Sequence, residues 1–451
     1  MNVPPSKPSL SRGALSAGIA QVIGRVSGLL RDVVFASIFG AGGAADAFFV
    51  AFRVPNMFRE LLAEGTLSNV FVPIFAKTNE QDGTEKAWAL ANALIGILLV
   101  VLGFITLGIY LLSEPLVWMF ASGFTDTPGK LETAAWLTRI LAPFIAGISI
   151  AALMGGMLNV RGKFFLPAIA PAILNVAIIL ACVFSDQWSL WTNTPAIGAV
   201  ACAASISGVL TALIQYPALR RMGFRFRPNL RSHPEMSRIL RFIGVALVGV
   251  IVVQFNLLVE TQLASRESDG AVSWLMLSFR LVQIPMSVIA GSIAVAALAR
   301  FSLDRAQDDH AGSRETLGQA MESMMFLVIP AAVGLYVLAD PLVALCFERG
   351  AFTPTDTAAT AVLLQGYAFA VIGICVYRLL LPIFFALGDP YLPMKLSLVV
   401  MIIKVPVALG LMNYLGLMGL PLSHAVTVTL EICVMMWVLG KRLDGWKSGL
   451  W

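Results

Sequence analysis

The sequence predicts an all-α membrane protein with about 12 transmembrane helices, in two six-helix lobes related by a parallel repeat around a central cavity. Its composition, its long apolar runs and an internal repeat support this class. Of the 451 residues, 58% are hydrophobic and 13% are charged, and the mean hydropathy is +0.84. A soluble domain carries about 25% charged residues. This chain has about half that share, so it has too few polar side chains to cover its surface in water. Soluble enzymes, nucleic-acid binders and disordered chains are therefore excluded.

Twelve apolar runs are long enough to cross a bilayer, whose core is about 30 Å thick and needs about 20 residues per helix. Their length and their Leu, Ala, Gly and Ile content exclude the alternating strands of a membrane barrel. The second run is interrupted at Pro55 and Pro73. The runs are 13–39, 45–77, 86–113, 131–160, 166–185, 195–219, 238–264, 271–300, 314–339, 357–387, 393–412 and 418–440.

The distribution of basic residues predicts the orientation and the domains. With the N-terminus in the cytoplasm, 20 Lys and Arg residues fall on the cytoplasmic side, against only Lys130, Arg266 and Arg349 on the other. The positive-inside rule then places both termini in the cytoplasm. The longest basic stretch, 220–241, lies midway along the chain, and we favour a topology-setting linker there over a binding site for lipid headgroups or nucleic acid. We expect an N-terminal lobe at 1–220, a basic cytoplasmic linker at 221–236 and a C-terminal lobe at 237–451.

The two halves of the chain resemble each other at a nearly constant offset. LSEPLV at 112–117 matches LADPLV at 338–343, and GKFFLP at 162–167 aligns with GDPYLP at 388–393, both at a shift of 226. Phe52-Arg53 pairs with Phe279-Arg280 at a shift of 227. A shift of six helices preserves the membrane orientation, so the halves are parallel repeats. Two such lobes across a cavity allow alternating access, whereas the alternative is an old duplication that serves only packing.

Eight basic residues lie inside predicted spans, where each costs about 2.5–3.5 kcal/mol at a helix centre. We therefore expect most of them to face a polar cavity rather than lipid. Arginine binds phosphate oxygens through two parallel hydrogen bonds, so the set predicts an anionic substrate such as a phosphate or pyrophosphate. The alternative is that nearby acids neutralise the arginines in buried ion pairs. The basic residues are Arg25, Arg31, Arg53, Arg59, Arg139, Arg280, Arg378 and Lys404, and the acids are Asp32, Asp46, Glu60, Glu64, Glu260 and Glu431.

Spacing along the predicted helices suggests which of these residues are neighbours. Arg25 and Asp32 are seven residues apart and share a helix face. Glu260 and Lys404 are isolated in the second half, where they form either an ion pair or an ion-coupling site, and the sequence leaves this choice open. Gly24 and Gly28 allow another helix to approach closely.

Signatures of catalysis and cofactor binding are absent from the sequence. It contains no H-E-x-x-H, G-x-S-x-G, P-loop or dinucleotide-binding motif. Five scattered cysteines and three distant histidines form no metal-ligand pattern. The chain is therefore interpreted as a transporter without a cofactor or a metal, not as an enzyme.

Several motifs resemble the MurJ/MviN family of the multidrug/oligosaccharidyl-lipid/polysaccharide exporter superfamily. They are GRVSGLLRD at 24–32, FGAGGAADAFF at 39–49, RVPNMFR at 53–59 and AEGTLS at 63–68, and further similarity follows at 167–175 and 274–285. The resemblance implies a lipid II flippase in the bacterial inner membrane, which moves the undecaprenyl-pyrophosphate-linked peptidoglycan precursor to the outer leaflet by alternating access. Cell-wall synthesis and cell shape would depend on it.

The resemblance also implies roles for particular residues. Arg25, Arg31, Arg59 and Arg280 match the cavity arginines of the family and would bind the substrate, and Arg53 stands where relatives carry lysine. The cavity acids would be Asp32, Asp46 and Glu64. The family usually has 14 helices, and this chain stops after the twelfth predicted span, so the last two are expected to be either truncated or naturally absent.

The expected partners are lipid II, membrane lipids and cell-wall synthesis enzymes, with no nucleic acid. Three alternatives remain at this stage. The first is an exporter of another polyprenyl-linked glycan or of a small drug. The second is a non-transporting membrane scaffold for cell-wall enzymes, and the third is an intramembrane enzyme acting on polyprenyl phosphates.

Overall fold

The computed structural model describes residues 10–62, 68–230, 236 and 254–443. Within these ranges every regular element is helical, which confirms the predicted all-α class. The chain divides into two compact units, residues 1–254 and 255–451. Residues 237–253 lie outside the described ranges, so the predicted boundary at 237 stays a prediction.

The first unit is a bundle in which α1 packs along α8, and α7 packs along α10. Helices α6 and α7 form one membrane span that is interrupted at Ala142 and Pro143. Its elements are α1 (Leu10–Phe39), α2 (Gly43–Leu62), α3 (Ser68–Gln81), α4 (Thr84–Leu111), α5 (Ser113–Phe120), the 3₁₀-helix η2 (Ser122–Asp126), α6 (Lys130–Leu141), α7 (Phe144–Val160), α8 (Phe165–Val183), α9 (Ser185–Thr192) and α10 (Ile197–Arg221).

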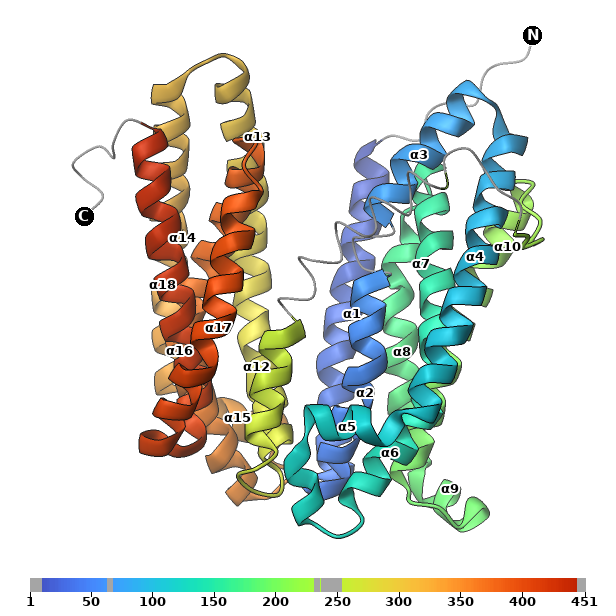
Figure 1. Cartoon of the computed structure of the whole chain (residues 1–451), viewed down its shortest axis with the longest axis vertical. Helices are drawn as coiled ribbons and strands as arrows, with labels where there is room; N and C mark the ends of the chain where they lie inside the picture. Colours follow the sequence, from blue (N-terminus) through green and yellow to red (C-terminus); the bar gives the residue numbers. More distant parts are fainter. Residues whose placement is uncertain (1–9, 63–67, 231–235, 237–253, 444–451) are drawn as a thin grey trace. The chain divides into compact units, whose positions relative to one another are not determined.

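The second unit is organised around α16, which packs against α12, α14 and α18 (Figure 1). Helix α16 begins with a capping box between Thr353 and Asp356, and Pro354 occupies its first turn. The unit opens with helical residues 255–264. It continues with α12 (Ala271–Pro285), the π-helix η3 (Met286–Ala290), α13 (Gly291–Ala306), α14 (His310–Val337), α15 (Ala339–Phe347), α16 (Pro354–Ala386), α17 (Tyr391–Leu415), the 3₁₀-helix η4 (Gly416–Met418) and α18 (Gly419–Arg442).

Within the described ranges, 8 helical stretches are long and apolar enough to cross a membrane. They cover nine of the predicted spans, because the stretch Tyr391–Arg442 contains both α17 and α18. The chain is therefore a multi-pass membrane protein. Of the other three predictions, 13–39 is α1, 45–77 is divided between α2 and α3, and most of 238–264 lies outside the described residues.

The predicted repeat is visible in the backbone. Leu112 follows α4 with φ −103° and ψ 21°, and Leu338 follows α14 with φ −97° and ψ 16°. Gly162 and Gly388, 226 residues apart, have φ of +72° and +74°, a region that glycine adopts readily because it has no Cβ. The order of helices around these turns is also the same, since α4, α5, α6–α7 and α8 correspond to α14, α15, α16 and α17.

Asp389, in the turn that precedes α17 and outside the membrane spans, forms an ion pair with the end of α18. Arg442, the last residue of α18, donates a hydrogen bond of 2.5 Å to a carboxylate oxygen of Asp389. This bond lowers the pKa of Asp389, and the backbone N–H of Leu392 acts in the same direction. The contact is therefore expected to persist until the pH falls through that lowered pKa.

Helices α7 and α10 touch backbone to backbone through glycine. A Cβ on Gly147 would lie 2.4 Å from the carbonyl carbon of Gly208, and a Cβ on Gly208 would lie 2.8 Å from the carbonyl oxygen of Phe144. Small residues give membrane helices this close approach, which replaces the hydrophobic driving force that is missing in lipid. The first unit therefore depends on the absence of side chains at this crossing.

Gly147→Ala is expected to lower the free energy of unfolding by about 1–3 kcal/mol, because the added methyl group has no room and the helices must separate. The thermal unfolding midpoint of the purified protein in detergent measures this effect. The control is Gly108→Ala in α4, where a Cβ meets no atom within 4 Å. Equal unfolding midpoints for the two variants would contradict the proposed tight crossing.

Candidate functional site

Arg31 is held in place between α1 and α8. Its Nε and one terminal nitrogen donate to Oδ1 of Asp32 at 2.9 and 2.6 Å, and its other terminal nitrogen donates to Oδ1 of Asn175 on α8 at 3.1 Å. The amide nitrogen of Asn175 donates in turn to the carbonyl oxygen of Gly24 and to Oγ of Ser27, at 3.1 and 3.0 Å. The guanidinium is therefore fixed by two helices.

Two glycines of α1 make this network possible. A Cβ on Gly24 would lie 3.7 Å from Cβ of Pro171, and one on Gly28 would lie 3.4 Å from the amide nitrogen of Asn175. The structure therefore has the predicted close approach of another helix at Gly24 and Gly28, and that helix is α8. Asn175 was not singled out from the sequence, because helical periodicity identifies a face of a helix but not which neighbour it meets.

Arg25, in contrast, is exposed on α1. Among the contacts of the described residues it has no hydrogen bond or ion pair. Asp32 lies on the same face of the helix, but it pairs with its chain neighbour Arg31. Arg25 is therefore accessible to water or to an anion.

Helix α2 carries a second polar network. Nε of Arg59 donates to Oδ1 of Asn56 at 2.8 Å, and a terminal nitrogen of Arg59 lies 3.8 Å from Oε1 of Glu60. Two amides donate to Glu60, that of Asn56 at 2.7 Å and that of Gln254 at 2.5 Å. Arg53 lies half-buried on the same helix. No sequence pattern identifies Asn56 or Gln254 as a partner of these charges, because neither is charged.

The predicted cavity acids have different surroundings. Asp46 has 0% exposed surface, and its Oδ2 accepts a hydrogen bond of 2.8 Å from the ammonium of Lys130. The same ammonium lies 4.4 Å from the ring centroid of Phe124. This pair joins the first turns of α2 and α6, so in this structure Asp46 offers no surface to a substrate. The predicted spans leave Lys130 in a loop before 131–160, whereas the structure makes it the first residue of α6. Glu64 lies outside the described residues.

In the second unit, Arg280 lies half-buried on α12 and donates to Oε1 of Gln283 at 3.0 Å. Helix α12 continues through Pro285 into the π-helix Met286–Ala290. Proline has no N–H to donate, and π-turns of this kind occur frequently at functional sites.

Glu260 and Lys404 form a buried ion pair in the second unit, with 2.5 Å between Oε1 and Nζ. Nδ1 of His424 lies 3.0 Å from the same oxygen, and the hydroxyl of Tyr367 donates to Oε2 at 3.4 Å. The helical residues 255–264, α16, α17 and α18 thus each contribute one side chain. An ion pair was one of the two alternatives that the sequence left open for these residues, the other being an ion-coupling site. The contacts with His424 and Tyr367 could not be predicted from the sequence.

Comparison with known proteins identifies close similarity along the chain. The family model described as "Lipid II flippase MurJ" matches residues 35–451. The chain is 33% identical over 425 residues to a "Probable lipid II flippase MurJ" of Bdellovibrio bacteriovorus, covering 93% of this chain and 80% of that protein. It is 34% identical over 448 residues to a "Lipid II flippase MurJ" of Burkholderia cenocepacia, covering 96% and 84%.

Solved structures share the fold. One described as lipid II flippase MurJ in an inward closed conformation has a TM-score of 0.81 and 22% sequence identity, and the match covers 94% of this chain and 87% of that chain. An inward-facing multidrug resistance MATE family transporter has a TM-score of 0.78 and 14% identity, covering 95% and 98%. At these identities the likeness concerns the fold alone.

Lys130→Met is expected to destabilise the protein by about 3–5 kcal/mol, because the carboxylate of Asp46 stays buried without the ammonium that lies 2.8 Å away. The double variant Asp46→Leu with Lys130→Met should recover most of this loss. Lys86→Met is the control, since its pair with Asp82 is exposed and worth at most about 1 kcal/mol. Thermal midpoints give all three values, and an unchanged midpoint for Lys130→Met would contradict a structural role for the pair.

Proposed function

Because the chain belongs to the lipid II flippase MurJ family, we propose that it moves lipid II from the cytoplasmic to the outer leaflet by alternating access. The family model covers residues 35–451. The relatives from Bdellovibrio bacteriovorus and Burkholderia cenocepacia, at 33% and 34% identity, are named as a probable lipid II flippase and a lipid II flippase. The substrate contains a diphosphate, and the chemistry of the candidate residues suits such a group. Because the family model and the relatives are those of flippases, the chain acts as a transporter rather than an enzyme.

Arg25 is the observation that best supports this proposal. It is exposed on α1 and has no partner among the described residues, although it belongs to a helix of 30 residues in a membrane protein. A diphosphate supplies the negative charge that this position lacks. Guanidinium groups bind phosphate oxygens strongly, through charge-assisted and often paired hydrogen bonds.

The other arginines of the proposal differ in how firmly they are held. Arg31 has Asp32 and Asn175 as partners, and Arg59 has Asn56. Fixing a guanidinium before the substrate arrives reduces the entropy lost on binding. In this proposal Arg31, Arg59 and Arg53 form the prearranged part of the site, and Arg25 binds the diphosphate as it enters. Arg280, on α12 of the second unit, is proposed as a further substrate-binding residue.

An exporter of cations or small cationic drugs is the main alternative, because the fold is shared with a MATE family transporter. Cation binding calls for carboxylates that no neighbouring cation neutralises. Asp32 and Asp46 instead lie 2.6 and 2.8 Å from the basic groups of Arg31 and Lys130. This charge balance favours an anionic substrate, and a polyprenyl-linked glycan other than lipid II would share that property.

The proposal includes a location and an orientation. The membrane is the bacterial inner membrane, where the precursor is made on the cytoplasmic face, and both termini lie in the cytoplasm because most basic loop residues do. Cell-wall synthesis enzymes that use lipid II on the outer face are the expected protein partners. The Glu260–Lys404 pair is proposed as the element that couples transport to an ion gradient.

Arg25→Ala is expected to reduce lipid II flipping about 10- to 100-fold, since a hydrogen bond to a charged group is worth about 1.5–3 kcal/mol. Arg25→Lys should retain part of the activity, because it keeps the charge but loses the paired geometry. Flipping is measured by the accessibility of lipid II in the outer leaflet after depletion of the native protein.

The control for Arg25→Ala is Lys86→Ala, which removes an exposed positive charge at the start of α4. All variants must insert and unfold at the wild-type temperature. If Arg25→Ala supports normal flipping at normal protein levels, the proposed role of this residue is wrong. If lipid II is chemically altered, the transporter assignment is wrong.

Lys404→Met is expected to destabilise the second unit, because it leaves Glu260 buried beside only His424 and Tyr367. Glu260→Gln combined with Lys404→Met should fold, because neither charge remains. In proteoliposomes, flipping by the double variant should no longer respond to an imposed proton or sodium gradient, although the wild type does. A double variant with an unchanged response would exclude the pair as the coupling element.

A further inference from the structure

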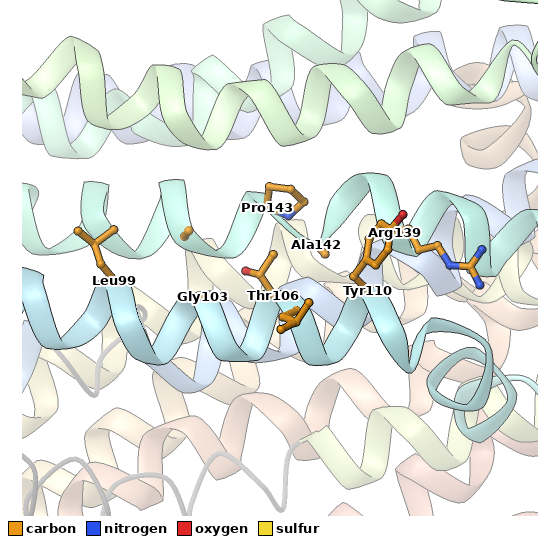
Figure 2. Close-up of a pocket in the computed structure, with 9 residues that line it drawn as sticks. Leu99, Gly103, Thr106, Tyr110, Arg139, Ala142 and Pro143 are labelled. Carbon is orange, nitrogen blue, oxygen red and sulfur yellow. The ribbon is translucent and has the colours of Figure 1, made fainter.

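A groove runs along the first unit between α4 and the span formed by α6 and α7 (Figure 2). Its volume is about 440 Å³, within the range of small-molecule sites. None of the residues proposed to bind the diphosphate lines it. The lining residues are Leu99, Gly103, Thr106, Leu107 and Tyr110 of α4, and Arg139, Ala142, Pro143 and Ala146 of the α6–α7 span.

The groove is open because small residues line both of its walls. On α4, a Cβ on Gly103 would meet no atom within 4 Å. On the opposite wall, the helix is interrupted between α6 and α7 at the small residues Ala142 and Pro143. Leu107 is 52% exposed, so the groove faces outward from the unit. Since α4 and the α6–α7 span both have the length and hydropathy of membrane helices, the groove between them lies at membrane depth.

The length of the groove corresponds to one leaflet. Eleven residues separate Leu99 from Tyr110 along α4, which is about 16 Å at 1.5 Å per residue. Half of a hydrocarbon core of about 30 Å is about 15 Å. A single acyl chain entering at the Tyr110 end would therefore reach Leu99 near the middle of the bilayer.

The end of the groove near Tyr110 is polar and positively charged. Arg139 lies there, and Figure 2 shows it at the opposite end of the labelled row from Leu99. Its Nε donates to Oγ of the buried Ser113, the first residue of α5, at 2.8 Å. This bond directs the guanidinium toward the end of α4, and the two terminal nitrogens have no partner among the described residues.

Thr106 provides a second polar group without a partner. It lies one helical turn from Tyr110, and its hydroxyl oxygen is buried and forms no hydrogen bond within the described part of the chain. Because this oxygen is buried, it forms part of the groove wall and is not a donor for a ligand in the groove. The groove thus contains an apolar channel that ends at one cation toward the membrane surface.

We propose that this groove is a binding site for an anionic phospholipid of the leaflet at the α4 C-terminal end. One acyl chain lies along Leu99, Gly103 and Leu107, and the phosphate accepts hydrogen bonds from Arg139. A phosphodiester matches the two terminal nitrogens of a guanidinium, and its charge balances a cation that has no carboxylate beside it. The proposal does not depend on what the protein transports.

Photocrosslinking in nanodiscs tests this site with the full chain. The discs contain phosphatidylcholine and a small fraction of a lipid probe whose acyl chain carries a diazirine, with either a phosphatidylglycerol or a phosphatidylcholine headgroup. In the wild type, the phosphatidylglycerol probe is expected to label peptides covering 99–110 and 139–146 several-fold more than the phosphatidylcholine probe does. Mass spectrometry of the digested protein measures the labelling.

Three variants separate the contributions to binding. Arg139→Gln should reduce labelling by the phosphatidylglycerol probe to the level of the phosphatidylcholine probe, because only the headgroup contact is lost. Gly103→Leu should reduce labelling by both probes several-fold, because its side chain fills the groove. Gly108→Leu is the matched control, since it adds the same side chain to α4 about 140° away, where a Cβ also meets no atom within 4 Å, and should label like the wild type.

Equal labelling by the two probes in the wild type would overturn the proposal, as would unchanged labelling in Gly103→Leu. Displacement of the probe by undecaprenyl phosphate but not by unlabelled phosphatidylglycerol would also overturn it, because the groove would then hold a polyprenyl chain. Displacement by unlabelled phosphatidylglycerol alone supports it.

Discussion

The architecture depends on one constraint, which is that a charge placed within apolar helices needs a partner of opposite charge or a ligand. Three pairs meet this constraint within the protein, and each of them also joins elements or fixes a side chain. Lys130 connects α6 to Asp46 of α2, Lys404 connects α17 to Glu260, and Asp32 orients Arg31 toward Asn175 of α8. Arg25, Arg139 and Arg378 have no carboxylate partner in the described part of the chain, and a phosphate ligand is proposed for the first two. The ion pairs maintain the fold, whereas the unpaired arginines are available to ligands.

The sequence was sufficient for the features that depend on local or periodic signals. Hydropathy predicted nine spans that are long apolar helices in the structure. The matched segments at 112–117 and 338–343 begin at turns with nearly the same backbone angles. The partners of the charged residues could not be predicted in this way. Asn175 is 144 residues from Arg31, and Glu260 is 144 residues from Lys404, so the contacts arise only when helices distant in the sequence pack together. Spacing on one helix suggested Arg25 as a neighbour of Asp32, but the adjacent Arg31 is the one that pairs with it.

The repeat preserves the backbone more completely than the chemistry: Arg53 has a counterpart in Arg280, but other polar residues have none. Gly162 and Gly388 end corresponding helices with the same positive φ, because a tight turn at that point needs glycine in either unit. In contrast, the residues 226 positions after Arg31 and Asn175 are Leu257 and Met401, which cannot form the corresponding polar contact. The second unit places its buried charges elsewhere, in the cluster of Glu260, Lys404 and His424. Two copies of one architecture therefore have different polar interiors, as expected if one unit contributes most of the substrate contacts and the other responds to a different signal.

A difference in rigidity separates the arginines that have partners from those that do not. Arg31 forms hydrogen bonds to two residues before any ligand binds, so its geometry is fixed at little further loss of entropy. Arg25 has rotamer freedom to lose on binding, but it is exposed and can meet an anion before that anion is fully enclosed. A carrier must release its substrate as well as bind it, and a site in which every arginine was prearranged would hold a diphosphate too firmly. In the proposed site, a mixture of fixed and free guanidinium groups would limit the affinity and keep the site selective for the charge and shape of a diphosphate.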